Sequence, residues 1–397
     1  MVLFSRPDVA SLCRSVRRDR QIQLARHILD ADIRRYVESS VTELLQERLL
    51  PGGVDMESIV SHLTGRAEGM FLWIRLMLFY LNSPGMTRSG RLEVIMEPIT
   101  EGLDLLDEMY SRIQTRIDSS NPHRKSFARR ALLWTVHASL SSSELQEALY
   151  PHGWDSENDG TDRFDHVVVI VCCGLLEKAQ DGRFQFIHLT ARVFAERGNP
   201  RSGAPLTPGK TLGKALLATR CLAYLSSHIP AKPLSGRMQV RAGRPGLRQQ
   251  WPLLEFVTLD WITFLLDSVK SCGDGLAEVT QLVQVASAFL GQPPRLMVWI
   301  EAFYTYCAAP LHFLASVQDA LRSLHMSAVH STQPKEKMYL LSEMNELVGD
   351  LGQINTTWGK NSWQESGRDL GRCDRLYQEQ VHGIHDGSIS RDSSTQA

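Results

Sequence analysis

The chain has 397 residues, 43% of them hydrophobic and 22% charged, which is ordinary for a globular protein and fits about two or three domains. Its formal net charge of −1 gives no general electrostatic attraction to nucleic acid or to an anionic membrane surface. The seven cysteines include no C-x-x-C pair, and such an odd, unpatterned set favours a reducing, cytoplasmic location over a disulfide framework.

The first elements follow from apolar spacing and from the residues that interrupt it. Residues 1–6 predict a short strand, which Pro7 ends. Residues 32–50 carry apolar side chains at helical spacing and predict a helix, and a Pro-Gly-Gly turn ends it. Asp55 then stands where its side chain can cap the next helix.

Residues 69–81 (GMFLWIRLMLFYL) form an unusually apolar segment with the composition of a membrane anchor. The segment is shorter than the run of about 20 apolar residues that crosses a bilayer, and Arg75 interrupts it. A short helix that is apolar on nearly all sides is typical of one buried between other helices. We therefore predict a core helix here and no transmembrane segment. The residues that follow, 82–102, predict a loop.

Residues 121–197 change from helices alone to helices with a hairpin. After an amphipathic helix over 103–117, the pattern predicts a helix over 127–137 and a third one opened by the capping box Ser141-x-x-Glu144. Periodicity leaves 167–171 open as a helix or a strand. Asp181-Gly182 between two apolar runs predicts a β-hairpin, and a short helix over 190–196 follows. Together these elements predict a winged helix.

The remainder of the chain predicts a mainly α protein. Residues 198–210 are rich in Gly, Pro and Ser and predict a linker. A helical array follows within 211–352, and a polar, partly disordered tail covers 353–397. The helices predicted in the array cover residues 212–226, 252–269, 276–290, 296–306, 311–325 and 335–351.

Motifs for catalysis, metal binding or phosphate binding are incomplete. Gly209-Lys210-Thr211 lacks the glycine of a P-loop, because Ala204 stands five positions before the Gly-Lys pair. The acidic run over 155–160 lacks the bidentate glutamate of a calcium loop, since His166 stands at the twelfth position. The vicinal pair Cys172-Cys173 predicts buried small hydrophobic side chains. We expect no enzyme, no metal site and no cofactor.

Two further features have alternative interpretations. Residues 232–248 contain five basic residues and no acidic one, but they offer no aromatic side chain for stacking on bases. A solvated loop is the favoured interpretation, and nucleic-acid binding by the winged helix is the alternative. His188 ends the second hairpin strand. A histidine satisfied by a nearby carbonyl is the favoured interpretation from its position alone.

Several segments, in order, resemble the fungal NACHT-type STAND NTPases, which are relatives of Nod-like receptors. The strongest are residues 66–73 (RAEGMFLW), followed by 102–104 (GLD) and 110–113 (YSRI). The segment covering 173–190 looks like that family's winged helix, a type also found with GPI inositol-deacylase. The other segments that resemble the family cover residues 3–7, 32–37, 143–149, 221–225, 252–256 and 299–302.

The resemblance implies a domain order and a function. Residues 1–8 match the last strand of the NTPase core, 9–120 the helical linker domain and 121–197 the winged helix. In this family ATP or ADP, held between core and winged helix, controls oligomerisation. Arg6 matches an arginine that senses the terminal phosphate, and His188 matches a winged-helix histidine that contacts the diphosphate.

No segment of the chain matches the P-loop or the magnesium-binding strand of these NTPases. The resemblance therefore implies a truncated NTPase: either the sequence is truncated at Met1, or this is a family member reduced to its regulatory half. The expected function is therefore the non-catalytic regulatory and interaction portion of a STAND signalling protein. Its expected partners are proteins, either through self-association or through an NTPase core supplied elsewhere. The alternative function is nucleic-acid binding through residues 232–248.

Overall fold

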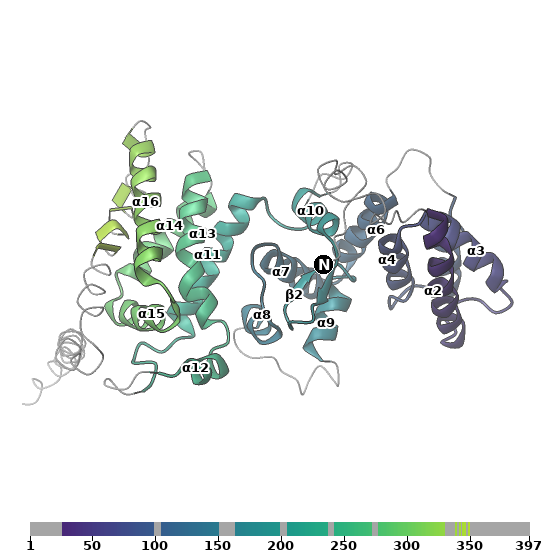
Figure 1. The fold of residues 1–397 in the computed structure, drawn as a ribbon, viewed down its shortest axis with the longest axis horizontal. Helices are drawn as coiled ribbons and strands as arrows, with labels where there is room; N and C mark the ends of the chain where they lie inside the picture. Colours follow the sequence, from purple (N-terminus) through teal and green to yellow (C-terminus); the bar gives the residue numbers. More distant parts are fainter. Residues whose placement is uncertain are drawn as a thin grey trace, which may run out of the picture.

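A computed structural model describes residues 26–98, 105–150, 163–198, 205–236, 242–271, 277–329 and scattered positions between 338 and 349. The described residues are mainly helical, and they contain one two-stranded sheet. Figure 1 shows three groups of elements along the long axis, with the hairpin in the middle group. The predicted strand over 1–6, the acidic run over 155–160 and the tail over 353–397 lie outside the described residues.

The first group consists of four helices at the right of Figure 1: α2 (Arg26–Gln46), α3 (Met56–Ala67), α4 (Phe71–Leu81) and α5 (Arg88–Met96). The helix predicted over 32–50 is α2, which begins and ends earlier than its apolar pattern. Asp55 caps α3 as predicted, since its carboxylate accepts hydrogen bonds from the backbone N–H groups of Glu57 and Ser58 at 3.2 and 3.3 Å.

Helix α4 is the apolar segment, and it lies in the hydrophobic core as predicted. Most of its large apolar side chains are buried, whereas Phe71 and Arg75 are exposed. None of the described helices is both long enough and apolar enough to cross a membrane. The buried side chains of α4 are Trp73, Ile74, Leu76, Met77, Leu78 and Leu81.

The loop predicted over 82–102 is wrong, because α5 lies within it. Its sequence, RSGRLEVIM, gives a weak apolar stripe, and an arginine stabilises its position. Arg91 is buried and donates hydrogen bonds to the carbonyl oxygens of Leu81 and Met86, both at 2.6 Å, and of Ser83 at 3.1 Å. The helix is thus positioned by polar contacts to the turn after α4, which apolar periodicity does not detect.

The middle group comprises α6 (Leu105–Ser119), α7 (Pro122–His137), α8 (Ser142–Leu149), α9 (Phe164–Val171), the hairpin, and α10 (Leu189–Arg197). The capping box at Ser141 and Glu144 is present. The ambiguous run over 167–171 is helical and forms most of α9. Helix α7 begins at Pro122, earlier than predicted, because proline is well tolerated in the first turn of a helix.

The hairpin pairs β1 (Leu176–Lys178) with β2 (Phe184–Phe186) in antiparallel register, with Leu176 opposite Phe186. Its turn contains Gly182 with φ of 81°, a left-handed conformation that glycine adopts without steric cost. The strands are shorter than the apolar runs that predicted them. Their order after α7, α8 and α9 nevertheless agrees with the sequence prediction.

The last group, at the left of Figure 1, contains α11 (Lys210–Ser227), α12 (Arg244–Gln250), α13 (Leu254–Ser271), α14 (Ala277–Leu290), α15 (Pro293–Tyr306) and α16 (Pro310–Val329). Helix α12 corrects the prediction of a loop for residues 244–248, whereas 232–236 is a loop as predicted. Arg244 donates to the carbonyl oxygen of Thr305 at 2.7 Å, and Arg248 forms an ion pair with Glu255 at 2.7 Å.

The core continues from the middle group into the last one. The rings of Trp134 on α7 and Phe256 on α13 lie 5.7 Å apart between centroids. Glu147 on α8 accepts a hydrogen bond from the Tyr224 hydroxyl on α11 and another, at 3.0 Å, from the backbone N–H of Leu253. These contacts fix the helical array against the hairpin-bearing group.

Candidate functional site

His188 lies where the sequence predicted, between the second hairpin strand and the following helix. It is the N-cap residue of α10, and its Nδ1 accepts a hydrogen bond from the backbone N–H of Thr190 at 3.2 Å. The side chain is exposed. The expectation of a histidine satisfied by a carbonyl was therefore wrong about the partner, because the ring acts as an acceptor that caps a helix.

A chain of hydroxyl groups connects His188 to α6. The Thr190 hydroxyl lies 2.8 Å from His188 Nδ1 and 2.8 Å from the Tyr110 hydroxyl. Because Nδ1 accepts from a backbone N–H, the neutral ring carries its proton on Nε2. If the Thr190 hydroxyl shares the same nitrogen as a second donor, its oxygen accepts from the Tyr110 hydroxyl. This arrangement leaves Nε2–H as the donor that His188 can offer to a ligand.

His188 borders a hollow of about 350 Å³ between the C-terminal end of α7, strand β2 and the start of α10. Arg192 and His137 line the same hollow. Burial, and then the charge of Lys214, lower the pKa of His137 to about 4. The hollow therefore combines one neutral, largely buried histidine with one exposed histidine and an arginine.

His137, which lines the hollow, also contacts α11. Gly213 on α11 packs so closely on α7 that a Cβ atom there would lie 2.6 Å from His137 Nε2. That nitrogen has no hydrogen-bond partner among the described residues. Sequence reasoning had not singled out His137 or Gly213, because their proximity depends on how two helices far apart in sequence cross.

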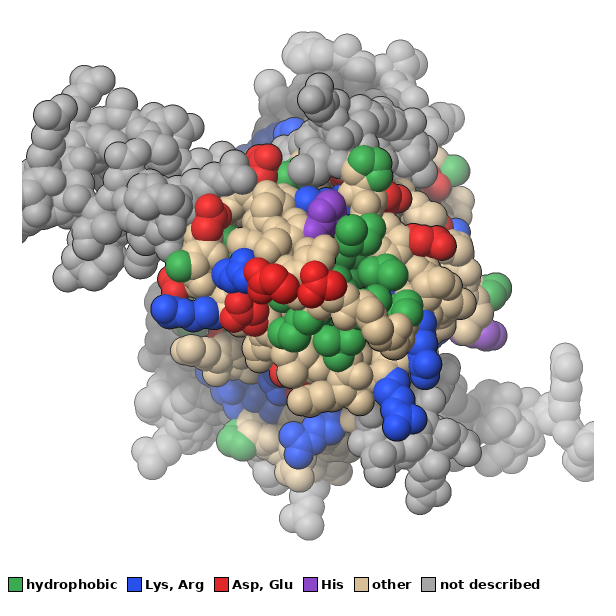
Figure 2. Space-filling model, turned by 90° about the vertical axis from the view of Figure 1, so that its right-hand side faces the viewer, with side chains coloured by type: hydrophobic (Ala, Val, Ile, Leu, Met, Phe, Trp, Pro, Cys, Tyr) green, Lys and Arg blue, Asp and Glu red, His purple; other side chains and the backbone are tan. Residues whose placement is uncertain are grey.

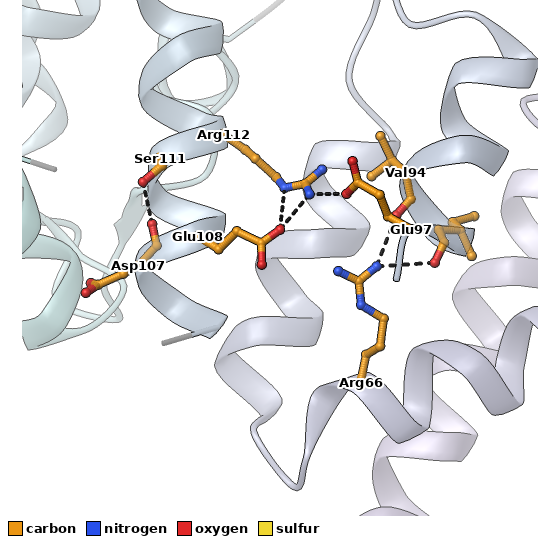
Figure 3. A network of polar contacts seen from close by, with 8 residues as sticks. Arg66, Val94, Glu97, Asp107, Glu108, Ser111 and Arg112 are labelled. Atoms are coloured by element: carbon orange, nitrogen blue, oxygen red, sulfur yellow. Dashed lines mark hydrogen bonds and ion pairs between the residues drawn. The ribbon is translucent and has the colours of Figure 1, made fainter. Parts of the chain in front are cut away.

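Segments 66–73 and 110–113, two of those that carried the family resemblance, each contribute an arginine to neighbouring polar contacts (Figure 3). Arg66 on α3 donates to the carbonyl oxygens of Val94 and Ile95 at 3.1 and 3.3 Å, and its guanidinium lies 5.3 Å from the centre of the Trp73 ring. Burial lowers the pKa of Arg66. These contacts thus fix the C-terminal end of α5 against α3.

Next to these contacts, Arg112 on α6 binds two carboxylates (Figure 3). Its guanidinium forms ion pairs with Glu108, at 2.6 Å, and with Glu97. Burial acts to lower the pKa of Arg112, but the bonds to Glu108 and Glu97 outweigh it and the pKa is raised. Tyr110 lies on the same helix, so α6 carries both these ion pairs and the hydroxyl contact toward His188.

The remaining candidates from the sequence do not form a site in the described residues. Arg6 lies outside them. Gly209 caps α11 and Lys210 begins it, as predicted for a linker entering a helix. Cys172 and Cys173 are buried as predicted, and burial raises the pKa of both thiols. Within the described ranges, no three His, Cys, Asp or Glu side chains gather as metal ligands would.

The chain matches no known protein family, no curated protein and no solved structure. The resemblance to STAND proteins therefore stays a prediction that rests on the residues quoted above.

Proposed function

We propose that this chain is the non-catalytic regulatory and interaction portion of a STAND signalling protein, with a winged helix between a helical linker domain and a helical array. The observation that carries the proposal is that α6 contacts both sides: Arg112 pairs with Glu97, next to α5, and Tyr110 reaches the exposed His188 through Thr190. In this proposal, the winged helix comprises α7 to α10, and α6 transmits changes at His188 to the network around Arg112 and Arg66.

The chemistry at His188 suits a phosphate that another domain holds. Nε2–H is a donor, Arg192 lines the same hollow, and an N–H donor or cation there would favour one nucleotide state over another. An NTPase core, in the same polypeptide or in a separate one, would supply the nucleotide and the groups for its hydrolysis. The chain itself would then require no cofactor.

The proposal predicts how the purified chain responds to nucleotide. Neither ATP nor ADP is expected to raise its melting temperature, and no phosphate release is expected, because residues that cradle a triphosphate and magnesium are not among the predicted motifs. Hydrolysis of ATP by this chain alone would contradict the proposal.

The coupling path has its own test. His188→Ala and Thr190→Val should both raise amide hydrogen exchange in α6 around Tyr110, because each breaks the chain of hydroxyl contacts. Arg192→Ala is the matched control, since the ion pair of Arg192 with Glu196 lies within α10 itself. Equal exchange in α6 for all three variants would reduce His188 to a local helix cap.

The alternative, nucleic-acid binding through 232–248, is less well supported. Arg244 and Arg248 are already engaged by the Thr305 carbonyl and by Glu255. A basic surface that bound nucleic acid would show an affinity that falls steeply with salt. A gel shift at low ionic strength that is lost at high salt would revive this alternative.

A further inference from the structure

Helix α9 has more apolar surface than the molecule covers. Its sequence, FDHVVVIV, is apolar at every position after the first turn, yet only Phe164 and Val168 are buried. Ile170 and Val171 are half-buried. A helix that is apolar all round is normally enclosed on all sides. The uncovered side of α9 therefore requires an explanation.

This side of α9 borders a hollow of about 710 Å³ that α2 and α4 also line. Each of the three helices contributes residues three or four positions apart, so each presents one continuous face. The stretch from Tyr36 to the end of α2 spans about 15 Å at about 1.5 Å per residue. The lining residues from these helices and from the positions directly after α2 and α4 are Tyr36, Ser40, Glu43, Leu44, Glu47, Arg75, Leu78, Phe79, Asn82, His166, Ile170 and Val171.

The two sides of the hollow carry opposite charges. Glu43 on α2 and Glu47 in the turn after it line one side, whereas Arg116 at the end of α6 and Arg124 at the start of α7 line the other side from the middle group. Among the described residues, none of these four has an ion-pair partner within 4.0 Å; Arg75, by contrast, is paired with Glu177 at 2.9 Å. Arg116 does donate to the carbonyl oxygen of Pro84 at 2.5 Å and lies over the Tyr80 ring. Among the described residues, Glu43, Glu47 and Arg124 are therefore the charges on the walls that have no side-chain partner.

Between the charged walls, the lining combines apolar side chains with small polar ones, such as Ser40 and Asn82. Phe79, Ile170 and Val171 are all half-buried and form the apolar part. Gly174, after α9, packs closely on α4, since a Cβ atom there would lie 3.0 Å from the Phe79 ring. The hollow is therefore a groove with a partly apolar floor, one acidic wall and one basic wall, set between two groups of helices.

We infer that this groove binds an amphipathic helix of a partner protein, about three turns long. Its apolar stripe would cover Phe79 and the exposed side of α9, as in other helix-in-groove complexes. One flank would carry basic residues facing Glu43 and Glu47, and the other would carry acidic residues facing Arg116 and Arg124. A uniformly acidic ligand fits less well because α2 would repel it.

The surface is separate from the candidate site at His188, because the two hollows share no lining residue. The inference does not rest on a nucleotide switch and holds or fails independently of it. Figure 2 views the α2–α3 end of the molecule, where hydrophobic side chains gather beside acidic ones.

Three synthetic helical peptides with the same leucine stripe test the inference by fluorescence anisotropy against the full chain. One has a lysine flank and a glutamate flank, the second has lysine on both flanks, and the third has glutamate on both. The mixed peptide should bind about fivefold more tightly than either control. It can choose the direction along the groove that places lysines against the acidic wall and glutamates against the basic wall, whereas each control is repelled by one wall.

Reversing the charge of one wall should change which of the three peptides binds most tightly. Arg124→Glu should favour the all-lysine peptide, and the double variant Glu43→Lys with Glu47→Lys should favour the all-glutamate peptide. All three side chains are exposed, so the fold should be retained and melting temperatures check this. Equal binding of the three peptides, or no binding, would overturn the inference. So would self-association of the chain that the charge-reversal variants abolish, because the groove would then bind a second copy.

Discussion

The two ends of the molecule are stabilised by different kinds of contact. At the α11–α16 end, buried rings dominate: Trp261 lies 5.8 Å from Trp299 and 5.9 Å from Phe289 between centroids. At the α2–α5 end, two buried arginines, Arg66 and Arg91, are only 2% and 4% exposed. No charged side chain among the described residues of the other end is buried to this degree.

This difference affects how closely the positions of the helices are determined at each end. Ring packing depends mainly on buried area and shape, and it tolerates small changes in helix position. A buried guanidinium instead requires several acceptors in fixed directions, because an unsatisfied donor costs free energy. The arginine contacts therefore define the positions of α3, α4 and α5 closely, at the end that also forms one wall of the apolar groove.

The largest effect on stability is expected from a substitution that removes a ring from the aromatic core. Trp261→Ala should lower the free energy of unfolding by about 4 kcal/mol, because it leaves a cavity where no water or side chain compensates. Urea unfolding followed by circular dichroism measures the change. Trp251→Ala is a matched control, because that indole is half-buried. Equal losses for the two variants would show that the aromatic cluster is not the main stabilising feature of this end.

A somewhat smaller effect is expected at the other end. Arg91→Met keeps the aliphatic part of the side chain but removes all hydrogen bonds to the Leu81, Ser83 and Met86 carbonyls, and should cost about 3 kcal/mol. Amide hydrogen exchange should rise in α5 and in the turn before it. Arg88→Met, at an exposed position of the same helix, should change little. A stable α5 in Arg91→Met would show that apolar packing alone positions it.

The sequence predicts local features better than features that depend on contacts between distant residues. The apolar pattern correctly predicted α4, the capping signals at Asp55 and Ser141, and the hairpin around Gly182, because these depend on neighbouring residues. It missed α5 and α12. Helix α5 is short and depends on Arg91 reaching three carbonyls, a contact that no local pattern specifies.

The candidate site shows the same limit. The place of His188 between strand and helix was predictable, because hairpin and helix signals flank it directly. Its connection to Tyr110 through Thr190 was not, because Tyr110 and Thr190 are 80 positions apart in sequence. The close approach of Gly213 to His137 also depends on tertiary packing.

The junction between the middle and last groups offers a test of intermediate size. Gly213→Ala places a methyl group 2.6 Å from His137 Nε2 and should cost about 2 kcal/mol through overpacking. His137→Ala in the same chain should recover much of the loss, because it removes the clashing ring. Thermal unfolding of both single variants and the double variant measures this coupling. Simple additivity of the two losses would contradict the close packing.

The smallest expected effect is a dependence of stability on pH at the same junction. The pKa of His137 is about 4 in the folded protein and 6.5 as its ordinary value. Below about pH 6.5 the unfolded chain binds a proton that the folded protein does not. The contribution of His137 to the free energy of unfolding is therefore complete above pH 6.5 and is lost as the pH drops toward 4. The expected loss is about 1–2 kcal/mol after allowance for the partial exposure of the ring.

Charged groups near His137 and a second titrating residue, Asp260, modify this pH dependence. Lys214, Lys210 and Arg192 disfavour the charged ring, whereas Glu196 favours it. In the array, burial raises the pKa of Asp260 to about 6, so that group has the opposite effect: its folded form takes up a proton first as the pH falls, which adds stability.

The experiment must separate these two groups. In an Asp260→Asn background, unfolding free energies between pH 7 and 4 should fall for the chain with His137 and stay flatter for His137→Gln. The glutamine keeps a polar side chain of similar reach but does not titrate. Parallel curves for the two chains would mean that His137 is protonated equally in the folded and unfolded states, and that α11 does not exclude water from the ring.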